Sequence, residues 1–415
     1  MKYNFDEIIP RRGTHSIKWD NSDDPDMLPL WVADMDFRAA PCILEALQRR
    51  LDHGVFGYVR VPESYYQSVI NWFSRRHGWT MQREHILYTT GVIPAIAAIL
   101  QSITKPGDKV LMQTPVYNCF FSCLRNAGNV LVENPLVCKN NHFEIDFEDF
   151  ERKIVDEGVK VFLLCNPHNP TGRVWTPEEL TRMGDICMRH NVFVISDEIH
   201  NELVMPGHHY TPFASLHPEY AEHCAICTSS SKSFNIAGLQ IANITVADSR
   251  VRALIDKGIN INETCDVNPF GVEALQAAYT PEGEEWLTQL MEYIHGNYQY
   301  LCQFLAERLP QLSVTRIEGT YLAWVDCAAL NIPSRQLSEL LRREAHVWFT
   351  AGEEYNPSGS TYLRINLACP RAILGEAMRR FYTFCKKKSV KYLASSKSRR
   401  NFAFASRKNE VAIVI

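Results

Sequence analysis

The stretch Ser229-Ser230-Ser231-Lys232-Ser233-Phe234-Asn235-Ile236-Ala237-Gly238-Leu239 decides the fold, because it places a lysine among small hydroxyl residues. The apolar run 225–228 lies directly before it and is typical of a buried strand. A lysine amine on a tight turn, with hydroxyls beside it, is suited to a Schiff base with a flat aldehyde that carries a phosphate. The stretch therefore predicts a site at the end of a strand.

Two further polar groups follow apolar runs upstream of Lys232. Asp197 follows the run 192–196, and Asn169 lies in the segment 166–172 after the run 161–165. Because ligands bind at the carboxyl ends of parallel strands, we expect these groups to meet at one site.

The order of apolar runs and amphipathic stretches predicts an α/β fold. Continuous Val/Ile/Leu/Phe runs separated by helices indicate a mostly parallel sheet covered on both faces. We expect its strands at 109–112, 130–132, 161–165, 192–196 and 225–228. We expect helices at 42–51, 95–100, 284–309, 334–345 and 371–384, with later strands at 320–325 and 361–367.

The length of 415 residues is enough for two domains. We expect an N-terminal segment (1–50) that joins a smaller α+β domain, a large domain (51–285), the rest of the small domain (286–387) and a tail (388–415). From residue 386 onward the chain carries nine Lys or Arg residues and one Glu, which predicts a solvated basic tail that ends in apolar residues 411–415.

Composition bounds the partners and the compartment. The net charge of −4 gives no bulk field that favours nucleic acid or membrane, so we expect neither partner. The 13 cysteines are scattered along the chain, which predicts reduced thiols and no metal site. The first residues have no apolar stretch typical of a signal peptide, and we therefore expect a cytoplasmic protein.

The lysine, aspartate and asparagine, in this order, resemble the fold-type I pyridoxal 5'-phosphate (PLP) enzymes of the class I/II aminotransferase superfamily. Over roughly residues 1–387, the motifs 12–20, 31–37, 196–200 and 368–371 resemble the MalY/PatB group of cystathionine β-lyases, or C–S lyases. The resemblance implies a large domain with a mostly parallel sheet flanked by helices, and a smaller α+β domain.

The site residues implied are these. Lys232 would bind the PLP aldehyde and move protons, Asp197 would hold the pyridine nitrogen, and Asn169 the phenolic oxygen. The phosphate would lie at the helix start Gly91-Val92-Ile93 and at the hydroxyls of Ser229 and Ser231. The other implied contacts are Tyr117 and His200 at the ring, Tyr58 at the phosphate of a neighbouring subunit and as a catalytic group, and Arg364, Ala33 and Asn169 at the substrate.

The resemblance implies a lyase that cleaves L-cystathionine or related cysteine S-conjugates to a thiol (homocysteine or sulfide), pyruvate and ammonia. Tyr58 implies a homodimer with shared sites and an amino-acid substrate. Gln240 stands where many aminotransferases have a phosphate-binding Arg, and His200 where they have a Tyr. A class I/II aminotransferase is the alternative enzyme. A regulatory protein that binds a transcription activator is the alternative of another class.

Overall fold

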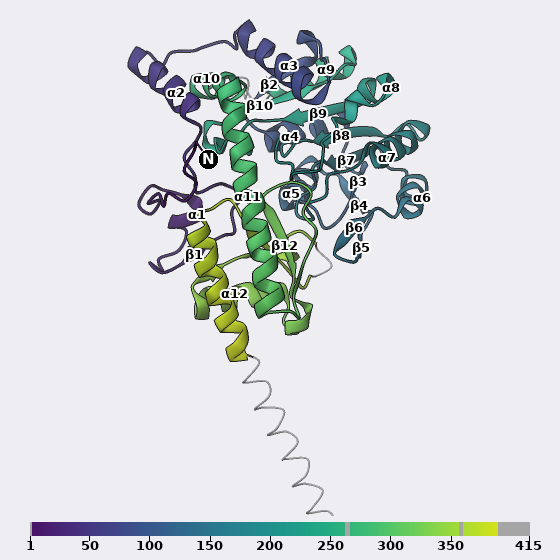
Figure 1. The fold of residues 1–415 in the computed structure, drawn as a ribbon. Helices are drawn as coiled ribbons and strands as arrows, with labels where there is room; N and C mark the ends of the chain where they lie inside the picture. The colour runs from purple at the N-terminus through teal and green to yellow at the C-terminus, as the bar shows by residue number, and fades with distance from the viewer. Residues whose placement is uncertain (1, 262–265, 357–359, 389–415) are drawn as a thin grey trace, which may run out of the picture.

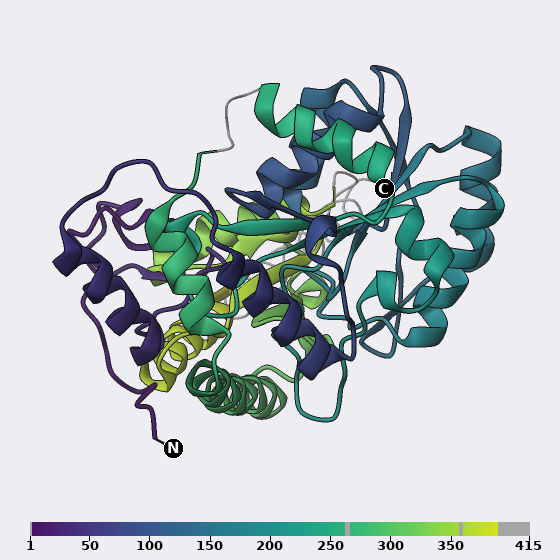
Figure 2. The same cartoon turned by 90° about the horizontal axis from the view of Figure 1, so that it is seen from above.

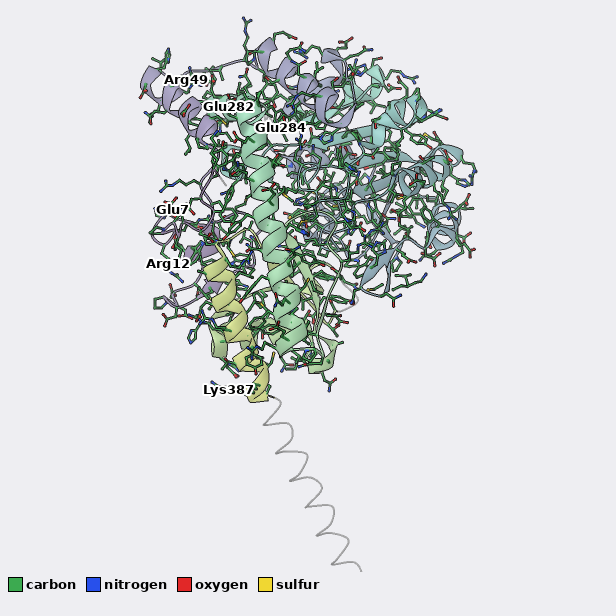
Figure 3. All side chains as sticks on the ribbon, viewed as in Figure 1. Glu7, Arg12, Arg49, Glu282, Glu284 and Lys387 are labelled. Carbon is green, nitrogen blue, oxygen red and sulfur yellow. The ribbon has the colours of Figure 1, made fainter. Side chains whose placement is uncertain are left out.

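The computed structural model describes residues 2–261, 266–356 and 360–388 of the chain, so the apolar end of the basic tail lies outside the described residues. Two sheets organise it, with the long helix α11 (Pro281–Arg308) running beside both (Figure 1). Glu284 marks the start of α11 and Lys387 the end of the helix over residues 371–388, at opposite ends of the molecule (Figure 3).

The larger sheet has seven strands in the order β2-β10-β9-β8-β7-β3-β4. Only β10 runs against its neighbours, so the sheet is mostly parallel, as expected. Strands β2 and β10 were not among the predicted strands. In order along the sheet, the strands are β2 (Ile86–Thr89), β10 (Ala242–Thr245), β9 (Cys224–Thr228), β8 (Phe193–Asp197), β7 (Val161–Cys165), β3 (Lys109–Met112) and β4 (Val130–Glu133).

Alternate side chains of the sheet pack into two hydrophobic clusters, one on each face. In β7, Val161 and Leu163 belong to the cluster that also contains α4, α5 and α9, whereas Phe162 and Leu164 belong to the other cluster. Helices lie on both sides of the sheet (Figure 2). This double burial explains the continuous apolar runs in the sequence.

Around the larger sheet, the helices expected at 42–51 and 95–100 are present with adjusted bounds, and further helices that were not expected accompany them. The helix expected at 95–100 begins three residues earlier, because Gly91 rather than Pro94 precedes its first turn. Another helix starts after Thr176 with a capping box, in which the Thr176 and Glu179 side chains each accept from the other's backbone N–H. These helices are α2 (Pro41–His53), α3 (Glu63–His77), α4 (Val92–Ile103), α5 (Asn118–Ala127), α6 (Phe147–Glu157), α7 (Pro177–Arg189), α8 (Pro218–Glu222), α9 (Ser249–Ile261) and α10 (Pro269–Ala278).

The smaller sheet has the order β11-β12-β15-β14 and is antiparallel. Its strands are β11 (Ser313–Val314), β12 (Leu322–Asp326), β15 (Tyr362–Asn366) and β14 (Thr350–Ala351), with α12 (Ser334–Ala345) packed nearby. The N-terminal segment, with α1 (Ile17–Asp20), joins this part through β1 (Leu28–Pro29), which pairs with β13 (Val347–Trp348). A hairpin of β5 (Val137–Lys139) and β6 (His142–Glu144) extends the larger part.

The expected boundary between residues 285 and 286 falls inside α11, so our division into domains remains a proposal. No helix among the described residues has the length and apolar character needed to cross a membrane.

Candidate active site

Lys232 lies in the turn after β9 and reaches the N-terminal segment 31–37, which we call the strap. Its Nζ donates to the carbonyl oxygen of Ala33 at 2.6 Å, and the Tyr321 hydroxyl donates to the same oxygen at 3.0 Å. Burial, together with the nearby Arg364 guanidinium, lowers the pKa of Lys232, although Asp34 and Asp197 oppose this shift. The site therefore favours a neutral amine more than water does.

The strap itself is tied to both sheets, which fixes the carbonyl that Lys232 contacts. Asn366 donates to the carbonyls of Val32 and Asp34 at 2.6 Å each. The side chain of Asn235 accepts from the Met35 N–H and donates to the carbonyls of Met35 and Phe37. A partly buried charge cluster supports the other side of the strap, with the ion pairs Arg11–Asp34, Arg11–Asp36, Lys18–Asp34 and Lys18–Asp36.

Asp197 is the last residue of β8, one residue beyond the strand that the sequence predicts, and it is buried. Its carboxylate accepts from the Ile199 N–H at 3.0 Å. Its cross-strand neighbours Cys165 and Cys227 are weakly polar. Burial raises the pKa of Asp197 to about 7, against the lowering effect of the Ile199 N–H and Lys232. A cationic nitrogen placed beside this carboxyl group would restore its charge.

His200 lies three residues further on and is 4% exposed. Burial, with Lys232 and Arg364 nearby, lowers the pKa of His200 to about 3, so the imidazole is neutral near pH 7. Its Nδ1 atom has no hydrogen-bond partner among the described residues. Because buried polar atoms are normally paired, this atom indicates a place where a bound molecule completes the site.

Asn169, in the loop after β7, and Arg364, in β15 of the smaller sheet, meet through a hydrogen bond. One guanidinium nitrogen of Arg364 donates to Asn169 Oδ1 at 3.2 Å, and another donates to the Trp31 carbonyl at 2.8 Å. Arg364 also lies over the Tyr355 ring, with 4.7 Å between its Cζ and the centroid. It is buried and forms no ion pair with a carboxylate of the described chain, which suits a bidentate anion from a substrate.

Tyr117 occupies the position before α5 and is largely enclosed. Burial raises the pKa of Tyr117 well above its usual range, and the thiol of Cys119 beside it adds to this effect. The same Cys119 thiol also lies near Lys232 and Tyr355. Tyr117 can therefore present a neutral aromatic face to a flat ring.

Of the groups that we expect to contact a phosphate, the backbone N–H groups at the start of α4 have no intrahelical acceptor, whereas the Ser229 hydroxyl is already hydrogen-bonded within the protein. Gly91 precedes α4, so the N–H groups of Val92 and Ile93 lie in the first turn, where no intrahelical acceptor exists. Ser229 Oγ donates to the Ile241 carbonyl and accepts from the Ser231 N–H at 3.0 Å, which commits its hydrogen inside the protein.

Two hydroxyls that the sequence analysis did not select flank Lys232. Ser230 Oγ and Ser233 Oγ are buried and have no partner in the described chain. Gln240 is exposed, with a left-handed backbone (φ 51°), after the short helix Ala237–Leu239.

Tyr58 is far from buried: it is 98% exposed, in the loop between α2 and α3, beside the exposed Val55 and Phe56. No other site residue is among its described contacts. Sequence reasoning also missed Tyr321, Tyr355 and Asp34. Asp34 stands in the quoted motif 31–37 without a role, and neither tyrosine has a neighbouring signal in the sequence.

These residues fit PLP on the evidence of the structure itself. The Lys232 amine lies near Asp197 and Arg364, and the Tyr117 ring also lies near Arg364. The start of α4 follows β2 at the edge of the sheet where β9 ends, before Lys232. The unpaired His200 Nδ1 and serine hydroxyls are left for a polar molecule. Among the described residues, no group of three or more His, Cys, Asp or Glu side chains is arranged to hold a metal ion.

Comparison with known proteins shows which family of proteins the chain is similar to. Residues 25–381 match the family model for aminotransferase class I and II. The chain is 40% identical to cystathionine β-lyase PatB of Bacillus subtilis, over 91% of this chain and 98% of that protein. It is 33% identical to MalY of Escherichia coli, over 90% of this chain and 96% of that protein. A PLP-bound C–S lyase of Staphylococcus hominis superposes with a TM-score of 0.86 and 34% identity, covering 92% of this chain and 99% of that one.

Proposed function

Because the chain belongs to the aminotransferase class I and II family, we propose that it is a PLP-dependent C–S β-lyase. It cleaves L-cystathionine, or related cysteine S-conjugates, with water to a thiol, pyruvate and ammonia. The relatives named as cystathionine β-lyases and C–S lyases match nearly their full length, which supports this branch. The observation that carries the proposal is the buried Arg364, which forms no ion pair with a carboxylate of the described residues and lies close to the Lys232 amine.

The substrate role follows from charge. Arg364 binds the α-carboxylate, and Asn169 orients the guanidinium through their hydrogen bond. The Ala33 backbone, whose carbonyl is taken by Lys232, borders the same space. Lys232, with its lowered pKa, accepts the proton from the substrate Cα, because a neutral amine is the base form.

PLP, when bound, supplies the electron sink that makes loss of the Cα proton and of a β-substituent favourable. We assign Asp197 to its ring nitrogen, Tyr117 to its face, and Asn169 and His200 to its polar edge. The start of α4, at Gly91, Val92 and Ile93, and the hydroxyls of Ser229 and Ser231 are assigned to its phosphate. The neutral His200 adds no positive charge beside Lys232 and so does not lower the pKa of that amine further.

The deciding assay measures pyruvate from L-cystathionine with no keto acid present. We expect pyruvate and homocysteine in equal amounts, and loss of both in Lys232→Ala. In a parallel reaction, L-alanine is offered with a keto acid. Turnover only in this second reaction would contradict the lyase proposal and favour the aminotransferase alternative.

The proposal also covers the oligomeric state of the protein, its location in the cell and a regulatory partner. A homodimer is supported by the exposed Val55, Phe56 and Tyr58, with Tyr58 acting at the neighbouring subunit's phosphate. A cytoplasmic location is supported by the free cysteines of the described chain. A regulatory role through a transcription activator remains an expectation, and capture of such a regulator by a Lys232→Ala protein tests it.

A further inference from the structure

Asp197 is flanked on both sides by a cysteine of a neighbouring strand. Its cross-strand partner in β7 is Cys165, and its partner in β9 is Cys227. Because partners in a parallel pair project from the same face of the sheet and neighbouring strands lie about 4.8 Å apart, both thiols border the carboxyl group. The packing agrees, since both cysteines belong to the same hydrophobic cluster as Ile195, which lies two residues before Asp197 in β8.

The two thiols differ in their hydrogen bonds. Cys165 Sγ donates to the Pro167 carbonyl oxygen and accepts from the Asn169 N–H, each at 3.5 Å. Its hydrogen is therefore directed away from Asp197. Cys227 Sγ is fully buried and forms no hydrogen bond with a residue that the structure describes. A thiol is only a weak donor, so burial without a partner costs little at this position.

The carboxyl group of Asp197 is correspondingly short of donors. Within the described chain, only the Ile199 N–H donates to it, and this bond reaches Oδ1. Glu198, the next residue and also buried, accepts from two hydroxyl groups and a backbone N–H. Oδ2 of Asp197 is thus the carboxylate oxygen that a bound donor can take.

Two charged residues lie near Asp197: Lys232, in the turn after β9, and the adjacent Glu198. α5 contributes the thiol of Cys123, and α4 contains no ionisable side chain. Burial raises the pKa of this thiol and of the two cross-strand thiols, so all three are neutral near pH 7. The thiols therefore add neither charge nor a strong donor beside the carboxyl group.

We propose that Cys227 is a positioning residue, which acts on the cofactor through Asp197. It fills the place beside the carboxyl group with a weak donor and so leaves Oδ2 free for the N–H of the PLP ring. A hydroxyl group in this place would bind the carboxylate, and a carboxylate with an added donor stabilises a neighbouring cationic nitrogen less. Cys227 thereby keeps the ring nitrogen protonated to higher pH. The role rests on the proposed function, in which Asp197 binds that nitrogen.

The test loads the full-length protein with PLP that carries ¹⁵N at the ring nitrogen and follows its NMR signal against pH. The chemical shift reports whether this nitrogen is protonated. In Cys227→Ser, we expect the pH at which the nitrogen loses its proton to fall by about one unit, as for one added hydrogen bond to a charged group. Cys227→Ala, which adds no donor, should leave this pH unchanged. An equal fall in both variants would show that the donor is not the cause and would overturn the proposal.

Cys224→Ser is the matched control, because Cys224 is also buried in β9 but belongs to the hydrophobic cluster on the opposite face of the sheet. It should leave the pH of proton loss unchanged. Asp197→Asn separates this role from the proposed function. If Asp197→Asn lowers the pH of proton loss and Cys227→Ser does not, the role of Cys227 is overturned. If neither substitution lowers it, the pairing of Asp197 with the ring nitrogen fails as well. If Cys227→Ser does not fold, Cys227→Thr carries the same donor and decides in its place.

Discussion

Asp197 is a buried carboxyl group whose protonation state would change when a cationic cofactor binds beside it. Its pKa is raised to about 7 by burial, so the free group gains little from its charge. A cationic ring nitrogen in contact with it would favour ionisation and be held protonated in return. This reciprocal effect is the reason why we propose that the position requires a carboxylate rather than an amide.

We expect Asp197→Asn to lower kcat by about 10²–10³-fold while the protein stays folded, since a preorganised charge of this kind is worth several kcal/mol of barrier. Steady-state pyruvate formation measures the change. The control is Glu198→Gln, a neighbouring buried carboxyl group whose contacts are Ser196, Tyr210 and Phe213 instead of the site. Near-normal turnover in Asp197→Asn would exclude the proposed role.

His200 gives a pH dependence of stability with a defined sign. Its pKa falls from the ordinary 6.5 to about 3 on folding, so below pH 6.5 the unfolded chain binds a proton that the folded chain does not. Stability is therefore lost as pH falls, by about 1–2 kcal/mol between pH 6.5 and 5 from this group alone.

Urea denaturation of the wild type and of His200→Gln at pH 7.5 and 5.0 checks this expectation. Asp197 and Glu198, whose raised pKa values act in the opposite direction, are present in both proteins and cancel in the difference. The variant should lose about 1–2 kcal/mol less than the wild type on acidification. Equal losses would show that His200 does not stay neutral in the folded protein.

The strap is the element that turns separate residues into a site. Asn235 has a left-handed backbone (φ 57°), and its side chain makes three hydrogen bonds to the strap. Asn235→Gly removes those bonds without straining the backbone. We expect a loss of about 1–3 kcal/mol in unfolding free energy and lower activity, because the Ala33 carbonyl loses its fixed place.

Denaturant unfolding and pyruvate assays together measure this change. Asn140→Gly is the matched control, because Asn140 also has a left-handed backbone (φ 51°) but lies in the exposed hairpin turn between β5 and β6. It should change stability by less than about 0.5 kcal/mol. Equal effects of the two substitutions would mean that the strap contacts add nothing.

The features that could be predicted from the sequence are those that produce a local pattern of apolar and polar residues. The strands at 161–165 and 225–228 are buried on both faces, so their apolar runs are unmistakable, and the polar residues just after them lie at the site. Strand β10 contains Asn243 and Thr245 and carries no such run. Tyr321 and Tyr355 reach the site through contacts across the chain, such as that of Tyr321 with Ala33, which no local pattern reveals.

The loop around Tyr58 exposes the large apolar side chains of Val55 and Phe56 to solvent. We propose that the second subunit of a homodimer covers this loop. Mixing Tyr58→Phe with Lys232→Ala protomers tests this by complementation. A mixed dimer would contain one site with both defects and one with neither, so its activity should exceed that of both parents. Confirmed subunit exchange without any gain would argue against a shared site.

The strap also has a consequence for the order in which the protein is made. Residues 31–37 leave the ribosome early, yet their partners Asn235, Thr350, Arg364, Asn366 and Ala368 are translated about 200 to 335 residues later. Until then, the strap carbonyls that these residues bind can bond only to water or to earlier residues, as Met35 does with Arg11 and Asp34 with Lys18. The pocket around Lys232 therefore closes after the last strand has been translated, and cofactor capture is an event of the finished chain, whatever folds earlier.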